Sequence, residues 1–250
     1  MTKIILRGYN GRMGHVITDI VKNDGDAEIV AGIDIVEGPA DFATYTTLKD
    51  CKENADVIID FSSPKTLDEE LDYAVEKNVP IVLCSTGFSE SDLKAIDEAS
   101  KKVAILRSAN MSVGINVVSE LLKQAAKILG ENGFDIEIVE AHHNQKKDSP
   151  SGTALLLADA MNAACDNKYE YVYDRSERRE ARPENEIGIS SVRGGSIVGE
   201  HSVIFAGLDE VIEIKHTAFS RAIFGKGAVA GAKYLKGKPA GMYGMGDVIK

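Results

Sequence analysis

The chain has 250 residues, 44% of them hydrophobic, with a formal net charge of -10 at pH 7. This length allows one large domain or two ordinary ones, and the apolar share allows a substantial core. The acidic balance argues against a protein that wraps nucleic acid, which needs a basic face. No apolar run approaches the roughly 20 residues that cross a bilayer, and the N-terminus leads directly into a strand pattern without a signal peptide. The cysteines, Cys51, Cys84 and Cys165, are scattered, so we expect reduced thiols in a cytoplasmic protein.

Between Lys3 and about Asn110, short apolar runs alternate with amphipathic stretches. Strands are predicted over Lys3–Arg7, Glu28–Asp34, Ala55–Phe61, Pro80–Cys84 and Val103–Arg107. Helices are predicted over Arg12–Asn23, Lys65–Lys77 and Ser89–Ser100. Buried strands separated by helices are typical of β-α-β units, so this half should contain a parallel sheet.

The pattern changes after Asn110. Helices are predicted over Val113–Gly130, Ser151–Ala164 and Ser220–Leu235, and strands over Phe134–His143, Ile187–Arg193, Ser196–Ala206 and Asp209–His216. Glycines at 194–195 and 207 indicate hairpins, which favours an antiparallel or mixed sheet. The polar segment 166–186, with its charge run from Arg175 to Arg182, is most simply a solvated loop or short helix. The glycine-rich stretch 237–246 should be ordered only by packing on the first half.

The predicted fold is α/β, with a Rossmann-like parallel-sheet domain over residues 1–112, completed by 220–250. A second, α+β domain covers residues 113–219 and holds the mixed or antiparallel sheet.

A glycine loop, Gly8-Tyr9-Asn10-Gly11-Arg12-Met13-Gly14, follows the first strand and opens a helix, and Asp34 ends the second strand. Glycines in this context allow a tight turn and a close pyrophosphate, and the acid can accept from a ribose hydroxyl. The pattern is G-x-x-G-x-x-G, and we expect Asn10 to tolerate a positive φ at the middle position. A glycine-rich turn without a ligand remains an alternative.

The residue after Asp34 is Ile35, so a 2′-phosphate would meet a carboxylate with no adjacent cation. We therefore expect NADH to serve at least as well as NADPH. Arg12, inside the loop, could partly restore the use of NADPH.

The most informative segment is Glu140-Ala-His-His-Asn-Gln-Lys-Lys-Asp-Ser-Pro-Ser-Gly-Thr-Ala154. Histidines at a strand end are followed by lysines and by a helix start at Ser151-Gly152-Thr153, where free N–H groups bind anions. Each charge-assisted bond to a carboxylate contributes about 1.5–3 kcal/mol. This arrangement suits a small, doubly negative substrate that must be protonated, and the glycine loop suggests hydride transfer.

Each histidine has a less specific interpretation. His142 and His143 point to opposite faces unless the strand bends, so one could be structural and the other exposed. Glu140 could steady a histidine or merely end the strand, and Asp148 or Ser151 could cap the helix. We expect His201 to pack or support the sheet, His216 to be structural and His15 to lie on the surface. Scattered histidines and cysteines predict no metal site.

These residues resemble the 4-hydroxy-tetrahydrodipicolinate reductase family, formerly dihydrodipicolinate reductase, of the diaminopimelate–lysine pathway. The resemblance extends from end to end. It includes the glycine loop, Asp60-Phe-Ser-Ser-Pro64, Ser85-Thr-Gly-Phe88, Asn110-Met-Ser-Val-Gly-Ile-Asn116, the 140–154 segment and Arg193-Gly-Gly-x-Ile-Val-Gly-Glu-His201.

The resemblance implies a role for each part. The cofactor would contact Gly8, Tyr9, Asn10, Gly11, Arg12, Met13, Asp34, Cys84, Ser85, Thr86, Ser108, Ala109, Asn110 and Met111. His142 would be the proton donor or acceptor and Lys146 a second proton donor, with Lys147 solvated. His143, Ser151, Gly152 and Thr153 would hold the substrate. The family is usually a homotetramer joined through the sheets of its second domain, and the Arg175–Arg182 run could contact a neighbouring subunit.

The chain departs from the family pattern at Asn10, where the family usually carries glycine, and at Cys84-Ser85-Thr86-Gly87, where the family usually reads Gly-Thr-Thr-Gly. Cys84 could crowd the nicotinamide or its ribose. Two other functions remain open: another two-domain nicotinamide oxidoreductase, which would not need the 140–154 segment, and a non-catalytic protein that senses dinucleotides.

Overall fold

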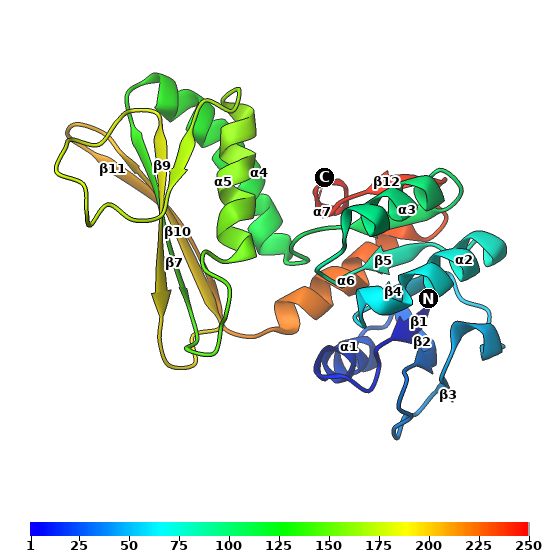
Figure 1. Ribbon diagram of the computed structural model, residues 1–250. Helices are drawn as coiled ribbons and strands as arrows, with labels where there is room; N and C mark the ends of the chain where they lie inside the picture. The colour runs from blue at the N-terminus through cyan, green and yellow to red at the C-terminus, as the bar shows by residue number, and fades with distance from the viewer. Residues whose placement is uncertain (250) are drawn as a thin grey trace. The chain divides into compact units, whose positions relative to one another are not determined.

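The computed structural model describes residues 1–249, which form two compact units (Figure 1). Unit 1 comprises Met1–Val113 and the chain from Ala222 onward, and unit 2 comprises Gly114–Arg221. Unit 1 is therefore built from two separate stretches of the sequence, and unit 2 from one.

Unit 1 contains a seven-stranded sheet in the order β12-β6-β5-β4-β1-β2-β3, with every pair of neighbours parallel. The strands are β1 (Thr2–Arg7), β2 (Ala27–Ile33), β3 (Ala43–Tyr45), β4 (Val57–Asp60), β5 (Ile81–Leu83), β6 (Ala104–Arg107) and β12 (Gly241–Tyr243). The helices are α1 (Arg12–Lys22), α2 (Leu67–Lys77), α3 (Glu90–Ser100), α6 (Ala222–Leu235) and α7 (Met245–Val248). The predicted Rossmann-like parallel sheet is confirmed.

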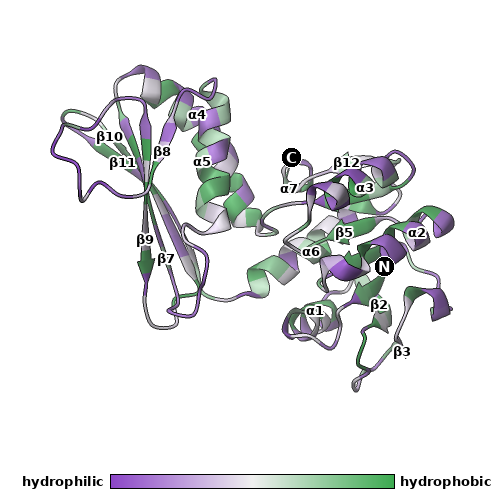
Figure 2. Cartoon of the chain, in the orientation of Figure 1, coloured by the Kyte–Doolittle hydropathy of each residue, from purple (hydrophilic) through white to green (hydrophobic). Residues whose placement is uncertain are grey.

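Both faces of this sheet are buried, as the continuous apolar strands predicted. Ile4 and Leu6 belong to one hydrophobic cluster, whereas Ile5, between them, belongs to the other. This alternation places a core layer on each side of the sheet, because successive side chains of a strand point to opposite faces. Figure 2 shows the apolar residues on the central strands β4 and β5 and polar residues on the outer helix α3.

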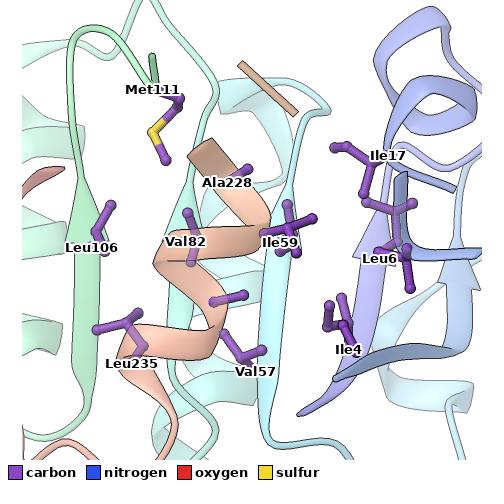
Figure 3. Packing of buried hydrophobic residues seen from close by; sticks show 14 of the residues in the cluster. Ile4, Leu6, Ile17, Val57, Ile59, Val82, Leu106, Met111, Ala228 and Leu235 are labelled. Atoms are coloured by element: carbon purple, nitrogen blue, oxygen red, sulfur yellow. The ribbon is translucent and has the colours of Figure 1, made fainter. Parts of the chain in front are cut away.

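Helix α6 completes one of these core layers. Figure 3 shows α6 lying over strands that carry Val57, Ile59 and Val82, with Ala228 and Leu235 directed toward them. Gly227 allows a close approach, since a Cβ there would lie 1.6 Å from the carbonyl oxygen of Met111. The glycines of this helix therefore serve packing, although glycine weakens a helix interior.

Two short strands of unit 1 were not predicted. β3 has three residues, and so does β12, which lies in the stretch 237–246 that we expected to be ordered only by packing on the first half. β12 pairs with the edge strand β6 over Gly241–Tyr243. Three residues are too few to show a period-two pattern, so the sequence could not distinguish these strands from loops.

Unit 2 contains a five-stranded mixed sheet in the order β11-β10-β7-β9-β8. The strands are β7 (Asp135–His142), β8 (Glu170–Val172), β9 (Glu186–Arg193), β10 (Gly199–Ala206) and β11 (Val211–Ala218), and the helices are α4 (Val113–Glu131) and α5 (Gly152–Ala164). The two helices lie side by side on one face of this sheet (Figure 1). Ile136 and Ile138 of β7 pack against Leu122 and Leu157 of these helices in one buried cluster.

The glycine pair at 194–195 does not join two paired strands, so the hairpin predicted there is wrong. β7 lies between β9 and β10, pairing parallel with β9 and antiparallel with β10. The 207–209 turn does connect the antiparallel pair β10 and β11. A glycine pair marks a turn, but long-range pairing decides which strand becomes the neighbour.

The polar segment 166–186 is not a simple solvated loop, which corrects the sequence interpretation. It contributes β8, which pairs with β9, and its arginines bind carboxylates of the sheet. Arg175 contacts Glu137 at 2.8 Å and Arg182 contacts Asp135 at 2.6 Å, while Arg178 also pairs with Glu186. This network fastens the segment to β7 and β9.

Among residues 1–249, no helix is long and apolar enough to cross a membrane.

Candidate active site

The glycine loop of unit 1 is a tight turn between β1 and α1. Gly8 adopts φ 78°, and a Cβ there would lie 2.7 Å from the carbonyl oxygen of Phe61. A Cβ at Gly14 would lie 2.2 Å from the carbonyl oxygen of Tyr9, so both positions require glycine. Helix α1 begins at Arg12 after Gly11, which has no side chain to cap it. The first amides of α1 are therefore available to an anion such as a pyrophosphate.

Asn10 fits this loop differently from our expectation, since it is not among the described residues with positive φ. Its backbone N–H donates to Asp34 Oδ2 at 3.1 Å, and its side-chain amide donates to the carbonyl of Val36 at 3.2 Å. Asn10 therefore ties the glycine loop to the end of β2. Tyr9 is buried, and its ring packs edge-on against Phe42.

A pocket of about 460 Å³ opens at the carboxyl ends of the strands. Its lining includes Gly8, Gly11 and Asp34, which the sequence predicted. The lining residues that the sequence analysis missed are Arg7, Ile33, Ile35, Thr46, Phe61, Ser62, Ser63, Lys65 and Thr66. They lie at or beyond the carboxyl ends of β1, β2, β3 and β4, where parallel α/β sheets bind ligands. The residues that follow each predicted strand could therefore have been proposed as candidates from the sequence.

The other predicted cofactor residues follow β5 and β6, further along the same edge of the sheet. Ser85 donates to Asp60 Oδ2 at 2.5 Å, and Asp60 also accepts from Ser62. Ser108 donates to the carbonyl of Asn110 at 2.9 Å. Cys84 is half-buried, and burial raises the pKa of its thiol well above its usual value. Cys84 is therefore a neutral side chain at this edge rather than a thiolate nucleophile.

In unit 2, strand register gathers the polar residues. Glu140 and His142 continue the row of β7 side chains that includes Ile136 and Ile138, and therefore point to the helix-covered face. Arg193 of β9 lies opposite His142, and His201 of β10 lies opposite Glu140. The hydrophobic core thus ends in a polar cluster at one end of the sheet.

The carboxylate of Glu140 is fully buried and holds this cluster together. Oε1 accepts from Arg193 Nη2 at 2.7 Å and from the backbone N–H of Ser151 at 3.1 Å. Oε2 accepts from Arg193 Nη1 at 2.9 Å and lies 2.6 Å from His142 Nδ1. Although burial opposes the charge, these hydrogen bonds lower the pKa of Glu140 to about 2. Of the two interpretations of Glu140, the structure favours the one in which it steadies a histidine.

The two buried histidines lie in contact. The rings of His142 and His201 meet edge to face with centroids 5.2 Å apart, and His201 Nε2 lies 3.0 Å from Ser151 Oγ. Burial lowers the pKa of His201 to about 4, with help from His142, so His201 is neutral near pH 7. Burial also lowers the pKa of His142, while Glu140 raises it. His201 supports the cluster, as the sequence suggested, and also contacts the residue at the start of α5.

The chain bends directly after β7, which ends at His142. His142 is buried and His143 is only partly so, and a turn follows in which Lys146 N–H donates to the carbonyl of His143 at 3.1 Å. Lys146 is partly buried and forms an ion pair with Asp148 at 2.9 Å, whereas Lys147 is exposed. Lys146 thus lies at the site while Lys147 faces solvent, which is the difference expected from the sequence.

Helix α5 begins beside this cluster. Ser151 is its N-cap, because its Oγ accepts from the N–H of Ala154 at 3.1 Å. Gly152 and Thr153 form the first turn of α5, at the positive end of the helix dipole. A Cβ at Gly152 would meet open space among the described residues, so the start of the helix is open at this position. An anion approaching here would meet a helix N-terminus with Lys146 and His142 on neighbouring segments.

Glu140, His142 and His201 each offer a potential metal-ligand atom, and these atoms lie within 4.8 Å of one another. Histidines that are scattered in the sequence are thus adjacent in space. Each oxygen of Glu140 already has two partners, among them the permanent cation Arg193. A divalent ion would have to displace these bonds, so the geometry favours a hydrogen-bonded network.

Comparison with known proteins gives a consistent result. Family models for the N-terminus and C-terminus of dihydrodipicolinate reductase match residues 2–111 and 114–249. A protein of Caldanaerobacter subterraneus named 4-hydroxy-tetrahydrodipicolinate reductase is 52% identical over 250 residues, covering 100% of this chain and 99% of that protein. One of the same name from Clostridium tetani is 51% identical, covering 98% and 96%.

A solved structure shares the fold. Dipicolinate-bound dihydrodipicolinate reductase from Paenisporosarcina sp. TG-14 superimposes with a TM-score of 0.82 at 22% identity, covering 99% of each chain. The chain therefore belongs to the dihydrodipicolinate reductase family, as its motifs predicted.

Proposed function

We propose that this protein reduces the cyclic imine formed from hydroxy-tetrahydrodipicolinate to tetrahydrodipicolinate with a nicotinamide dinucleotide, in lysine and diaminopimelate biosynthesis. The observation that carries the proposal is the cluster at the end of β7. It combines a histidine held by a buried carboxylate, a partly buried lysine and an open helix N-terminus in a chain of this family.

The substrate carries two carboxylates on one ring. We assign one or both to the amides of Gly152 and Thr153, aided by Ser151 and His143, since helix N-termini favour anions. A bound nicotinamide supplies the hydride. The reduced ring then needs a proton, which His142 donates as the imidazolium or Lys146 donates as the ammonium. The neutral group left behind regains its proton from solvent.

The residues of unit 1 fit a dinucleotide. The cradle formed by Gly8, Gly11 and Gly14 would close if any Cβ filled positions 8 or 14, and the adjoining pocket contains Asp34. We assign the pyrophosphate to this loop and the first turn of α1, and a ribose hydroxyl to Asp34. The segments 84–86 and 108–111 would line the nicotinamide side.

Asp34 and the exposed Ile35 support a preference for NADH, or at least equal use of both cofactors. A 2′-phosphate would be repelled by Asp34, with Lys65 of the pocket lining and Arg12 of the glycine loop as the cations able to offset it. Comparing kcat/KM for NADH and NADPH at one ionic strength tests this assignment. A large NADPH preference would show that these cations outweigh Asp34.

We further assign the protein to the cytoplasm, as a homotetramer joined through the sheets of unit 2. The outer face of this sheet carries exposed apolar residues, including Val139 and Val192, which a partner subunit could cover.

One assay tests the activity. Oxidation of NADH is followed while the preceding synthase makes the substrate in situ from pyruvate and aspartate semialdehyde. Turnover that depends on the synthase is the expected result. Cofactor binding without turnover would instead support a dinucleotide sensor, and turnover only with other carbonyl substrates would support a different oxidoreductase.

A further inference from the structure

Resting on the proposed role of His142, we propose that Glu140 and Arg193 are positioning residues that hold its imidazole with the proton on Nδ1. The same geometry points to Nε2 as the atom that exchanges a proton with the substrate, and to Gly199 as the residue that keeps this atom uncovered.

The first step concerns the nitrogen that faces Glu140. His142 Nδ1 lies 2.6 Å from Glu140 Oε2, within the range of a strong hydrogen bond. A carboxylate can only accept, so Nδ1 must carry the proton. In neutral His142 the lone pair is therefore on Nε2, and in the imidazolium Nε2–H is the donor that remains for another partner.

The second step concerns how Glu140 is kept ionised. Arg193 binds both oxygens of the carboxylate, and Ser151 N–H adds a third donor. A guanidinium does not lose its proton in proteins, so this pair keeps Glu140 an acceptor. Arg193 Nη2 also donates to the carbonyl of Asp148 at 2.8 Å, which ties the loop that carries Lys146 to the same carboxylate.

The third step concerns space around Nε2. A Cβ at Gly199 would lie 3.1 Å from His142 Nε2, closer to it than to any other atom around position 199. Gly199 has no positive φ among the described residues, so the backbone of β10 does not itself require glycine. An added methyl group would therefore crowd Nε2, which glycine leaves uncovered on this side.

The titratable groups around His142 come from every adjoining segment. The charged ones are Glu140 on β7, Arg193 on β9, and Lys146 and Asp148 in the loop before α5, and His201 on β10 is a neutral titratable neighbour. Glu140 raises the pKa of His142, whereas burial, Lys146 and Arg193 lower it. Replacing Glu140 with glutamine should therefore lower the pKa of His142 further. Because proton donation needs the imidazolium, the rate should then begin to fall at a lower pH.

The tautomer can be measured without any turnover. Nitrogen-15 NMR of histidine-labelled full-length protein reports whether Nδ1 or Nε2 carries the proton, and the His142→Gln variant identifies the signal. We expect Nδ1–H in the unsubstituted protein and a mixture of tautomers in Glu140→Gln. An Nε2–H signal in the unsubstituted protein would overturn the proposal, even if the protein proved to be an active reductase.

Kinetics provide the second test. Glu140→Gln should lower kcat by about 100-fold, near the lower end of what a positioned general acid contributes, with KM little changed. Arg193→Lys keeps the charge but loses the paired contact, so its activity should be intermediate. Unchanged kcat and pH profile in a folded Glu140→Gln variant would contradict the positioning role.

Gly199→Ala tests access to Nε2. It should lower kcat at least as strongly as Glu140→Gln while leaving the Nδ1–H signal in place. Gly194→Ala is the matched control, because its added methyl group would project into open space among the described residues. Full activity in a folded Gly199→Ala variant would show that Nε2 is not the reacting atom. Failure of the unsubstituted protein to turn over the substrate, with the tautomer as expected, would refute the proposed function instead.

Discussion

Individual residues of the cluster in unit 2 show how a charge can be buried at little cost. Glu140 has no exposed surface, and each of its carboxylate oxygens has two hydrogen-bond partners. These four contacts offset the free-energy cost of removing the charge from water. The neighbouring His201 is buried as a neutral ring. Two environments a few ångströms apart thus keep one group ionised and the other uncharged, which is how proteins prepare acid–base sites.

The proposed proton donors can be separated by substitution. His142→Ala and Lys146→Ala should each lower kcat by about 100-fold or more, because each removes a positioned acid. Cofactor affinity and folding should persist, since neither residue lies in unit 1. Stopped-flow oxidation of NADH and a fluorescence titration measure these two quantities.

Lys147→Ala is the control for this pair, as Lys147 is exposed and should cost little. Near-normal turnover in both His142→Ala and Lys146→Ala would remove the assignment of proton donors to this segment.

The buried carboxylate also predicts a pH dependence of stability. The pKa of Glu140 is about 2 in the folded protein and near 4.5 when exposed, a difference equivalent to about 3 kcal/mol. This stabilisation is fully present above pH 4.5 and is lost as the pH falls toward 2. Thermal unfolding of the unsubstituted protein and Glu140→Gln should therefore converge as the pH falls.

Glu140 also raises the pKa values of His142 and His201, so the difference between the two proteins includes the loss of these charge interactions. A gap in Tm that stayed constant from pH 7 to pH 3 would show that the ionised carboxylate does not stabilise the fold.

At the scale of helices and strands, the sequence predicted those elements whose pattern is long enough to read. The alternation in β7 placed Glu140 and His142 on one face, and the Ser151-Gly152-Thr153 segment marked the start of α5. The residues that lie opposite β7 in the neighbouring strands could not be predicted from the sequence. Arg193 and His201 are 53 and 61 residues from Glu140, and only the register of β9 and β10 brings them opposite.

The glycine loop gives a prediction at this scale. Gly14→Ala places a methyl group against the carbonyls of Gly8 and Tyr9, which should destabilise unit 1 by about 1–3 kcal/mol and weaken NADH binding. Gly25→Ala is the control, since a Cβ at Gly25 would meet open space among the described residues. Fluorescence titration and thermal unfolding measure both effects. Unaltered NADH affinity in Gly14→Ala would mean that the loop does not shape the cofactor site.

At the scale of the whole molecule, the outer face of the unit 2 sheet predicts assembly. Val139→Asp combined with Val192→Asp should convert the proposed homotetramer into smaller species, because burying two added carboxylates per subunit is costly. Light scattering coupled to size exclusion measures the mass. Ile128→Asp, on the exposed side of α4, is the control within the same unit. A tetramer that survived the double substitution would place the subunit contact elsewhere.

The division of unit 1 into two stretches has a consequence for synthesis of the protein. Ala228, Val229, Ala232 and Leu235 of α6 fill one core layer beneath strands made more than a hundred residues earlier. On the ribosome, the N-terminal strands emerge first but lack this layer, whereas the uninterrupted segment 114–221 can collapse as soon as it is translated. Unit 2 should thus acquire its native structure before unit 1, whereas the N-terminal domain generally folds first during synthesis.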